Sequence, residues 1–264
     1  MFLPEAGPTE RKFYDRKDVI LLGFMANIKA QKAYNLHGKG DLEGAKKLYE
    51  EAIEGGLDQP KFLISYAILL FRSEEYEACQ GILRKAEKAN GITADQKTQV
   101  FTTYAACQSK LGMIDKGINL LEKQHAHSPC GQLYQVLGYL YVEKYDRRSG
   151  DPEDMDAWNE GAEKAEKFIL ESIDYDDEDS ICLDNMGQFL YRCRLDREKA
   201  KEWFEKAIAI KESQIDTLYF LSRYDLEEGN KDKAKERLSA ALEGRFSPLN
   251  FANRKMVEDE LNAL

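Results

Sequence analysis

The sequence predicts an all-α protein of about six helix hairpins, stacked side by side and closed by a C-terminal capping helix. Three observations predict this class. A pattern of small, large and small residues at positions i, i+4 and i+7 returns six times along the chain. Each copy follows a more apolar stretch that also has helical spacing. Corresponding positions such as Ala33 and Ala67 lie about 34 residues apart, the period of a helix–turn–helix repeat.

The recurring pattern marks the second helix of each predicted hairpin. Antiparallel helices approach closely only where a residue is small, and a large side chain then fills the neighbouring gap. One hairpin cannot bury its own apolar stripe, so neighbouring hairpins must stack. The six copies are Ala45, Tyr49 and Ala52; Cys79, Leu83 and Ala86; Gly117, Leu121 and Gln124; Ala165, Ile169 and Ser172; Ala200, Phe204 and Ala207; and Ala234, Leu238 and Ala241. The preceding helices carry compact residues near their middle, at Ala33, Ala67, Ala105, Gly138, Gly187 and Ser222.

Residues 1–17 contain two prolines and no helical period, so we expect an N-terminal arm. This arm is either a flexible, disordered segment or the cut edge of a longer protein. The only continuous apolar run, from Val19 to Met25, is too short to span a bilayer and is expected to be the apolar side of the first helix.

An insertion at about residues 146–161 lengthens the second helix of the fourth repeat. Asp151 followed by Pro152 is a typical helix start, and the apolar spacing predicts one helix from Pro152 to about Ile173, with Gly161 as a point of interruption. Two hypotheses apply to Trp158. It packs on Tyr145 or the preceding loop, or, together with Met155, it forms a contact surface for a second copy or a partner.

Two further helix boundaries are predicted near acidic and polar residues. In the acidic run 174–180, Asp179 or Ser180 is expected to cap the next helix; a calcium loop is the weaker alternative, because the required glycine and closing glutamate are missing. Near the C-terminus, Ser247 is the expected N-cap and Pro248 the first-turn residue of the capping helix.

These repeats resemble the tetratricopeptide repeat (TPR) family. The residues that carry the resemblance are Gly40, Ala45, Tyr49 and Ala52; Tyr104, Ala105, Gly112 and Pro129; Leu137, Gly138 and Tyr141; Ala200, Phe204 and Ala207; and Leu221, Gly229, Ala234 and Ala241. The resemblance implies a right-handed α–α superhelix, a TPR solenoid, over residues 18–264. It also implies that the first helix of each hairpin lines a concave groove in which partners lie as extended peptides.

The resemblance also implies which side chains face the groove. Carried over by position, they are Tyr34, Ile68, Phe71, Arg72, Thr102, Ala106, Lys110, Gln135, Tyr139, Gln188, Tyr191, Arg192, Tyr219 and Arg223. Tyrosine and arginine suit peptide recognition, although each tyrosine has packing against a neighbouring helix as its alternative. The family variant that grips a terminal carboxylate with a lysine and an asparagine is not expected, because Ala30 and Tyr34 stand at those positions.

Composition excludes several classes of function. The formal net charge of −10 argues against nucleic-acid binding and against adhesion to anionic membranes. The five cysteines are scattered singly, which favours reduced thiols and a cytoplasmic protein. His125 and His127 are expected in water at a helix end, and His37 likewise.

The sequence contains no phosphate-binding glycine loop, dinucleotide fingerprint, zinc-protease motif or nucleophile elbow. We therefore expect no enzyme activity, no cofactor and no metal. The hypothesis favoured by the sequence is a non-enzymatic scaffold that binds a protein or peptide partner in the concave groove. The alternative is a module that forms homodimers through the long fourth-repeat helix; an enzyme within the repeat fold is a third hypothesis that no motif supports.

Overall fold

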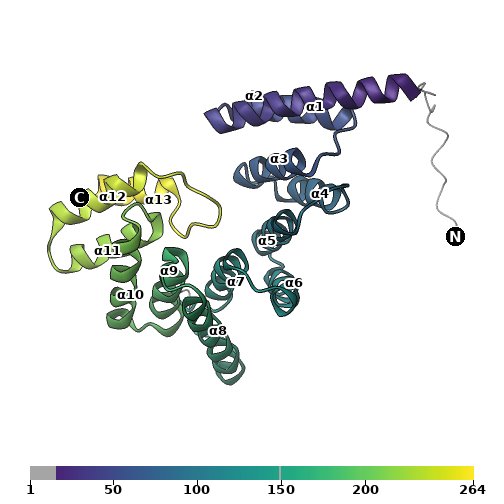
Figure 1. Cartoon of the computed structure of the whole chain (residues 1–264). Coiled ribbons are helices and arrows are strands. Elements are labelled where there is room, and N and C mark those ends of the chain that lie inside the picture. Colours follow the sequence, from purple (N-terminus) through teal and green to yellow (C-terminus); the bar gives the residue numbers. More distant parts are fainter. Residues whose placement is uncertain (1–15, 149) are drawn as a thin grey trace, which may run out of the picture.

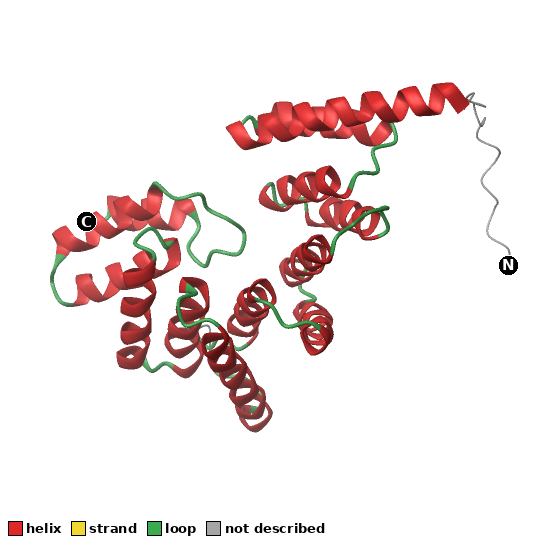
Figure 2. Cartoon of the chain, viewed as in Figure 1, coloured by secondary structure: helices red, strands yellow, loops and turns green. Residues whose placement is uncertain are grey.

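The computed structural model describes residues 16–148 and 150–264, and in these residues the chain forms α-helices and one π-helical turn but no strand (Figure 2). The predicted arm therefore lies outside the described residues, apart from its last two residues, which begin the first helix. The described helices pair into six antiparallel hairpins followed by one further helix, as predicted. No described helix is both long and apolar enough to cross a bilayer.

Each hairpin has a first and a second helix. The first helices are α1 (Arg16–Lys39), α3 (Pro60–Arg72), α5 (Ala94–Lys110), α7 (Gly131–Lys144), α9 (Ser180–Gln188) with its π-helical continuation η1 (Phe189–Arg194), and α11 (Ile215–Glu227). The second helices are α2 (Leu42–Glu54), α4 (Tyr76–Glu87), α6 (Ile114–His127), α8 (Met155–Tyr175), α10 (Arg197–Ile210) and α12 (Lys231–Leu242). The capping helix is α13 (Arg254–Asn262).

The recurring small–large–small pattern forms the contact between the two helices of each hairpin. All six large residues are 0% exposed: Tyr49, Leu83, Leu121, Ile169, Phe204 and Leu238. Burying a side chain of this size stabilises the fold by about 1.5–3 kcal/mol. The partner positions are small because the helices nearly touch there. At Gly187, an added Cβ would lie 2.6 Å from the ring of Phe204.

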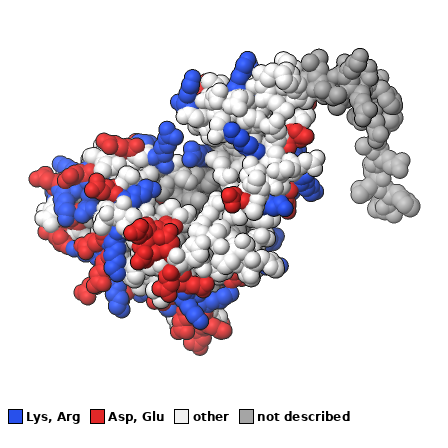
Figure 3. Space-filling view, in the orientation of Figure 1, with Lys and Arg blue, Asp and Glu red and all other residues white. Residues whose placement is uncertain are grey.

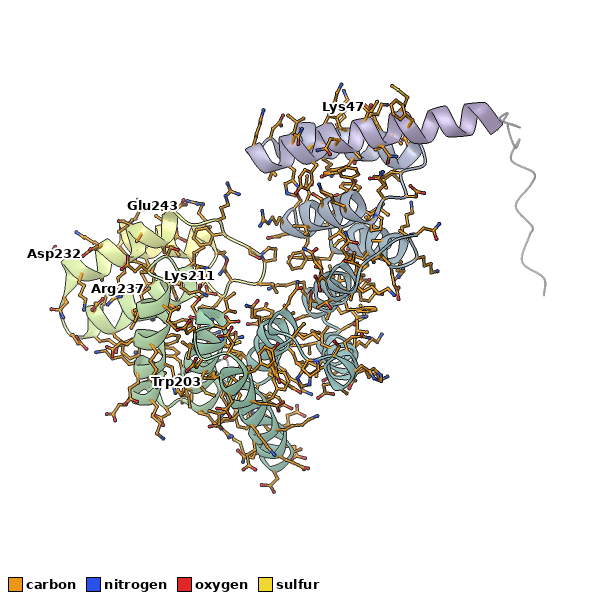
Figure 4. All side chains as sticks on the ribbon, viewed as in Figure 1. Lys47, Trp203, Lys211, Asp232, Arg237 and Glu243 are labelled. Atoms are coloured by element: carbon orange, nitrogen blue, oxygen red, sulfur yellow. The ribbon has the colours of Figure 1, made fainter. Side chains whose placement is uncertain are left out.

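The stack curves into an arc whose inner wall is built from the first helices (Figure 1). From α1 to α9, each first helix contacts the next first helix, whereas each second helix contacts its own partner and the following first helix. Helices that touch successive neighbours lie at the smaller radius. Figure 4 accordingly places Lys47 of α2 and Trp203 of α10 on the outer side of the arc.

The core consists of two apolar clusters that meet at α5. One is built from α1 to α5, and the other extends from α5 to the C-terminus. Leu249, in the segment between α12 and α13, packs against both clusters. In Figure 1 this yellow segment reaches from α12 into the space between the two arms of the arc.

The predicted start of the long fourth-repeat helix is wrong by three residues. α8 begins at Met155, and Asp154 caps it by accepting the amide N–H of Ala157 at 3.0 Å. Asp151 forms an ion pair with Arg147 instead. The helix then runs 21 residues without the interruption predicted at Gly161. The glycine instead makes room for the Tyr145 hydroxyl, which an added Cβ would overlap.

The start of the capping helix is also wrong, by a larger margin. Ser247 and Pro248 belong to a loop, and α13 begins only after Asn253, whose side chain accepts the amide N–H of Met256 at 2.9 Å. The predicted covering function is nevertheless confirmed, because Ala252 and Val257 are 0% exposed against the last repeat. The prediction for α9 is confirmed as well: Asp179 caps it, accepting the Ile181 amide at 2.9 Å.

Candidate binding groove

The concave face contains two cavities, one in each arm of the arc. The C-terminal cavity, about 740 Å³, lies among α7, α9, α11 and the segment 243–250. The N-terminal cavity, about 390 Å³, lies among α1, α3 and α5. Arg245 lines both, so residues 243–253, which we call the C-terminal loop, lie between the two cavities. The groove of this chain is therefore divided by one of its own loops.

The C-terminal loop is held by a buried carboxylate at the start of α11. Asp216 is 4% exposed and accepts three hydrogen bonds from the loop. The donors are the backbone N–H groups of Phe251 and Ala252, both at 3.0 Å, and the Asn250 side-chain amide at 3.1 Å. These bonds satisfy a buried acid whose desolvation would otherwise be costly. They also fix residues 250–252 as a loop, which explains why the capping helix cannot begin at Ser247.

Aromatic and cationic side chains surround the ring of Phe251 in the C-terminal loop. Its ring stacks on Phe220 with centroids 5.0 Å apart and an interplanar angle of 27°. The guanidinium carbons of Arg148 and Arg192 lie 4.3 and 4.6 Å from its centroid. Cation–π contacts of this kind contribute about 0.5–2 kcal/mol each.

Two of the arginines predicted to face the groove, Arg192 and Arg223, are paired with carboxylates of the chain itself. The Arg192 side chain is 3% exposed and pairs with Glu143 at 2.6 Å and Asp146 at 2.8 Å. Arg223 pairs with Glu260 of α13 at 3.1 Å. Both guanidinium groups are neutralised by carboxylates of the chain itself, 37 or more residues away in sequence.

Tyr139, Gln188 and Gln135 line the C-terminal cavity, as the groove prediction required. Gln188 is occupied internally, because its amide donates to Asp184 at 2.7 Å and its carbonyl accepts from Arg192 at 2.9 Å. The Tyr139 hydroxyl has no hydrogen-bond partner among the described residues. This oxygen is itself buried, so it is not a contact that the cavity offers to a ligand.

Several predicted groove residues belong to the core instead. Phe71 is 6% exposed and packs edge-on against Tyr76 at 5.7 Å, on the side of α3 that faces α4. Tyr219 is 5% exposed and packs against Phe220 and Phe251. Tyr191 is packed among aromatic rings, 4.9 Å from Phe220. Thr102 and Ala106 are buried in α5, and Lys110 lies over the ring of Tyr139 at 5.6 Å.

The N-terminal cavity brings together three of the predicted residues, Tyr34, Ile68 and Arg72. Tyr34 is 39% exposed. The cavity also contains groove residues that the sequence analysis missed: His37, Lys61, Gln96, Gln99 and Arg245. The groove positions carried over from the TPR family do not include Lys61, although on a helix Lys61 lies on the same face as Ile68 and Arg72.

Two histidine predictions are wrong. His37 lies in the N-terminal cavity, where its Nδ1 is 3.2 Å from the Ser65 hydroxyl, and burial followed by the charge of Arg72 lowers its pKa below 6.5. His125 is packed between the rings of Tyr134 and Phe168, with centroids 4.7 and 5.2 Å away. Neither lies simply in water, because neighbouring side chains partly cover both rings, whereas His127 at the end of α6 is exposed as predicted.

Trp158 on α8 packs against Tyr145, as the first of the two hypotheses states. Its ring meets Tyr145 edge-on at 5.9 Å, and the guanidinium groups of Arg147 and Arg194 lie 5.1 and 5.8 Å from its centroid. Met155 is half-buried one turn earlier. These contacts cover the aromatic side chain on which the homodimer alternative depended. In the described residues there is also no group of three or more His, Cys, Asp or Glu side chains placed to hold a metal ion.

Comparison with solved structures decides the architecture. A TPR protein from Thermus thermophilus superposes on 77% of this chain and 97% of its own with a TM-score of 0.61 and 19% sequence identity. The chain has the tetratricopeptide repeat fold. Human IFIT1, solved as a dimer with m7Gppp-AAAA, matches 89% of this TPR chain at a TM-score of 0.61 and 16% identity, but only 52% of IFIT1 is covered.

A third neighbour of this TPR chain is PilF of Pseudomonas aeruginosa, at a TM-score of 0.53 and 12% identity over 91% of this chain and 99% of that one. No protein-family model matches the sequence, and no curated protein matches it significantly. At these identities the likeness concerns the fold, so function must be argued from the groove itself.

Proposed function

We propose that this chain is a non-enzymatic scaffold that binds a peptide segment of a protein partner along its concave face. The observation that carries the proposal is the N-terminal cavity, where Tyr34 is 39% exposed beside Ile68. An exposed aromatic side chain next to an apolar one on a concave wall is the type of anchor that dominates binding at protein interfaces.

The repeat architecture supports the same proposal. From α1 to α9, consecutive first helices contact one another and form an inner wall, which offers an extended ligand many contacts without any change in the fold. The C-terminal loop already lies on this wall through backbone N–H groups and one aromatic ring, at Asp216 and beside Arg192. The C-terminal loop thus shows one way in which an extended segment can contact the concave wall of this protein.

The test is affinity capture from the native lysate with a groove variant and a matched outer-surface variant. The groove variant combines Tyr34→Ala with Ile68→Ser, and the control combines Leu170→Ser with Ile210→Ser, at side chains 44% and 46% exposed outside both cavities. Circular dichroism establishes that both remain folded. We expect the groove variant to lose its partner and the control to keep it; the opposite result would exclude the concave face.

A further inference from the structure

We propose that the N-terminal cavity is a binding site for an acidic peptide segment, with carboxylate side chains at both ends of a short apolar stretch. This inference deepens the proposed function and rests on it, because it names the chemistry of the partner that the concave face would bind. It starts from the charges around the cavity. Lys61, Arg72 and Arg245 line it, and no aspartate or glutamate of the described residues does.

The cationic lining of this cavity is opposite in sign to the net charge of the protein. The chain carries 48 acidic and 38 basic residues, and many of its cations are paired with carboxylates. Lys46, for example, pairs with Glu75 at 2.6 Å on the same hairpin stack. Among the described side chains, those of residues 23–148 and 150–264, Lys61, Arg72 and Arg245 form no ion pair. In Figure 3, several blue side chains border the hollow centre of this face, while red side chains lie mainly over the C-terminal half.

The cations are spaced along one helix face. Lys61, Ile64, Ser65, Ile68 and Arg72 of α3 all line the cavity, at the i, i+3, i+4, i+7 and i+11 spacing of a single face. The eleven residue steps from Lys61 to Arg72 correspond to about 16 Å along the helix axis. An extended peptide covers that length in about five residues, at about 3.3 Å each. The stripe is cationic at its ends, with the half-buried Ile68 between them and Ile64 and Ser65 nearly buried.

The remaining lining residues fit the same ligand. Lys61 lies 4.4 Å above the ring of Tyr34, so its ammonium group is held over the cavity wall without a carboxylate. The Gln96 carbonyl accepts the Thr93 amide at 3.0 Å, which leaves its NH₂ group to donate to a ligand. A peptide with acidic ends and an apolar centre would meet Arg72 and Lys61 with its charges and the half-buried Ile68 with its apolar centre, since Ile64 is only 3% exposed.

The net charge of the protein favours binding of an acidic peptide at the N-terminal cavity rather than elsewhere on the surface. A net charge of −10 repels an acidic peptide from most of the surface, whereas a concave site whose charged lining is cationic attracts it. A nucleic acid fits less well, because backbone tracking needs a longer basic stripe and base stacking needs several aromatic faces. Among the described lining residues, the cavity offers only Tyr34 and the smaller ring of His37 for stacking.

The experiment has two stages, both with the full-length protein. First, a random-peptide phage library is selected on the protein. We expect enriched sequences with two acidic residues about five positions apart around an apolar centre. Enriched peptides that lose binding to the Tyr34→Ala, Ile68→Ser variant but carry no acidic pair would overturn this inference and leave the groove function standing. A library that yields no groove-dependent peptide would contradict both.

Second, fluorescence anisotropy measures a labelled peptide with two aspartates around a leucine-rich centre, and its matched asparagine version. We expect Lys61→Gln with Arg72→Gln to weaken the aspartate peptide roughly tenfold and to leave the asparagine peptide unchanged. The control, Lys231→Gln with Lys235→Gln on exposed sites of α12, removes the same charge and should bind as the original protein does.

Charge reversal makes the test specific. In Lys61→Glu with Arg72→Glu, a peptide with lysines in place of the aspartates should become the preferred ligand. Equal loss of affinity in the α12 control would overturn the site, since the effect would then follow net charge alone. Tighter binding of a single-stranded oligonucleotide than of the aspartate peptide, lost in the same cavity variant, would also overturn it.

Discussion

At the scale of single residues, the groove depends on two carboxyl groups that the fold removes from water. Asp216 fastens the C-terminal loop, and Asp184 of α9 is 3% exposed beneath it. Asp184 accepts the Thr217 hydroxyl at 2.5 Å and the Gln188 amide at 2.7 Å. Burial, and then the nearby charge of Asp216, raise the pKa of Asp184 from 3.8 to about 7.

This raised pKa predicts a pH dependence of stability. Between about pH 4 and pH 7 the unfolded chain has released the Asp184 proton while the folded chain still binds it, so the free energy of unfolding falls as the pH rises through this window. We expect urea denaturation to show that fall, and Asp184→Asn to reduce it. The loss attributable to Asp184 is up to a few kcal/mol. An unchanged pH slope in Asp184→Asn would show that Asp184 does not carry this dependence.

At the scale of secondary structure, helix contacts depend on small residues at particular places. Gly187 of α9 faces Phe204 of α10, whose ring stacks on Phe220 of α11 at 5.0 Å and 7°. The glycine thus lets one aromatic side chain join two hairpins. Gly81 of α4, by contrast, has no neighbouring atom within 4 Å of an added Cβ.

The two glycines give a matched pair of substitutions. Gly187→Ala should lower the free energy of unfolding by about 1–3 kcal/mol, because a Cβ 2.6 Å from the Phe204 ring forces the stack apart. Gly81→Ala should raise it by about 0.5–1 kcal/mol, since alanine is the better helix former. Chemical denaturation of the two variants measures both. If both substitutions stabilise the protein, the helices do not approach as closely as described.

Local sequence patterns were sufficient to predict the hairpins but not all of their ends. Tyr49 and Phe204 were correctly predicted to be buried between helices. The pattern that predicts their burial, small residues at a fixed spacing on either side, lies within a single helix. Ser247 and Pro248 have the local chemistry of a helix start, yet Asp216 holds the following residues in a loop. That contact joins residues 35 positions apart, and no local pattern records it.

The candidate groove shows the same limit. Tyr34, Ile68 and Arg72, which the family resemblance predicts as groove residues, line the N-terminal cavity. Arg192 was not recognised as internally paired, because Glu143 and Asp146 lie 49 and 46 residues away in sequence. Lys61 was overlooked although the helical spacing of α3 would have found it.

At the scale of the whole molecule, the arc presents a concave wall that its own C-terminal loop divides. Leu249 packs against both core clusters, so the loop links the two arms as well as separating the two cavities. In the C-terminal arm, Phe251 and the paired arginines contact one another beside the larger cavity, whereas the N-terminal arm keeps Tyr34 and the cations of its cavity at its surface. Recognition is therefore expected to centre on α1, α3 and α5.

Site-specific photocrosslinking tests this central claim most directly. A photoreactive phenylalanine analogue is placed at Tyr34 on the concave wall or at Leu170 on the outer side of α8, side chains that are 39% and 44% exposed. After irradiation in the native lysate, we predict a discrete crosslinked partner from the Tyr34 position and none from the Leu170 position. A partner crosslinked from Leu170 but not from Tyr34 would contradict recognition by the concave face.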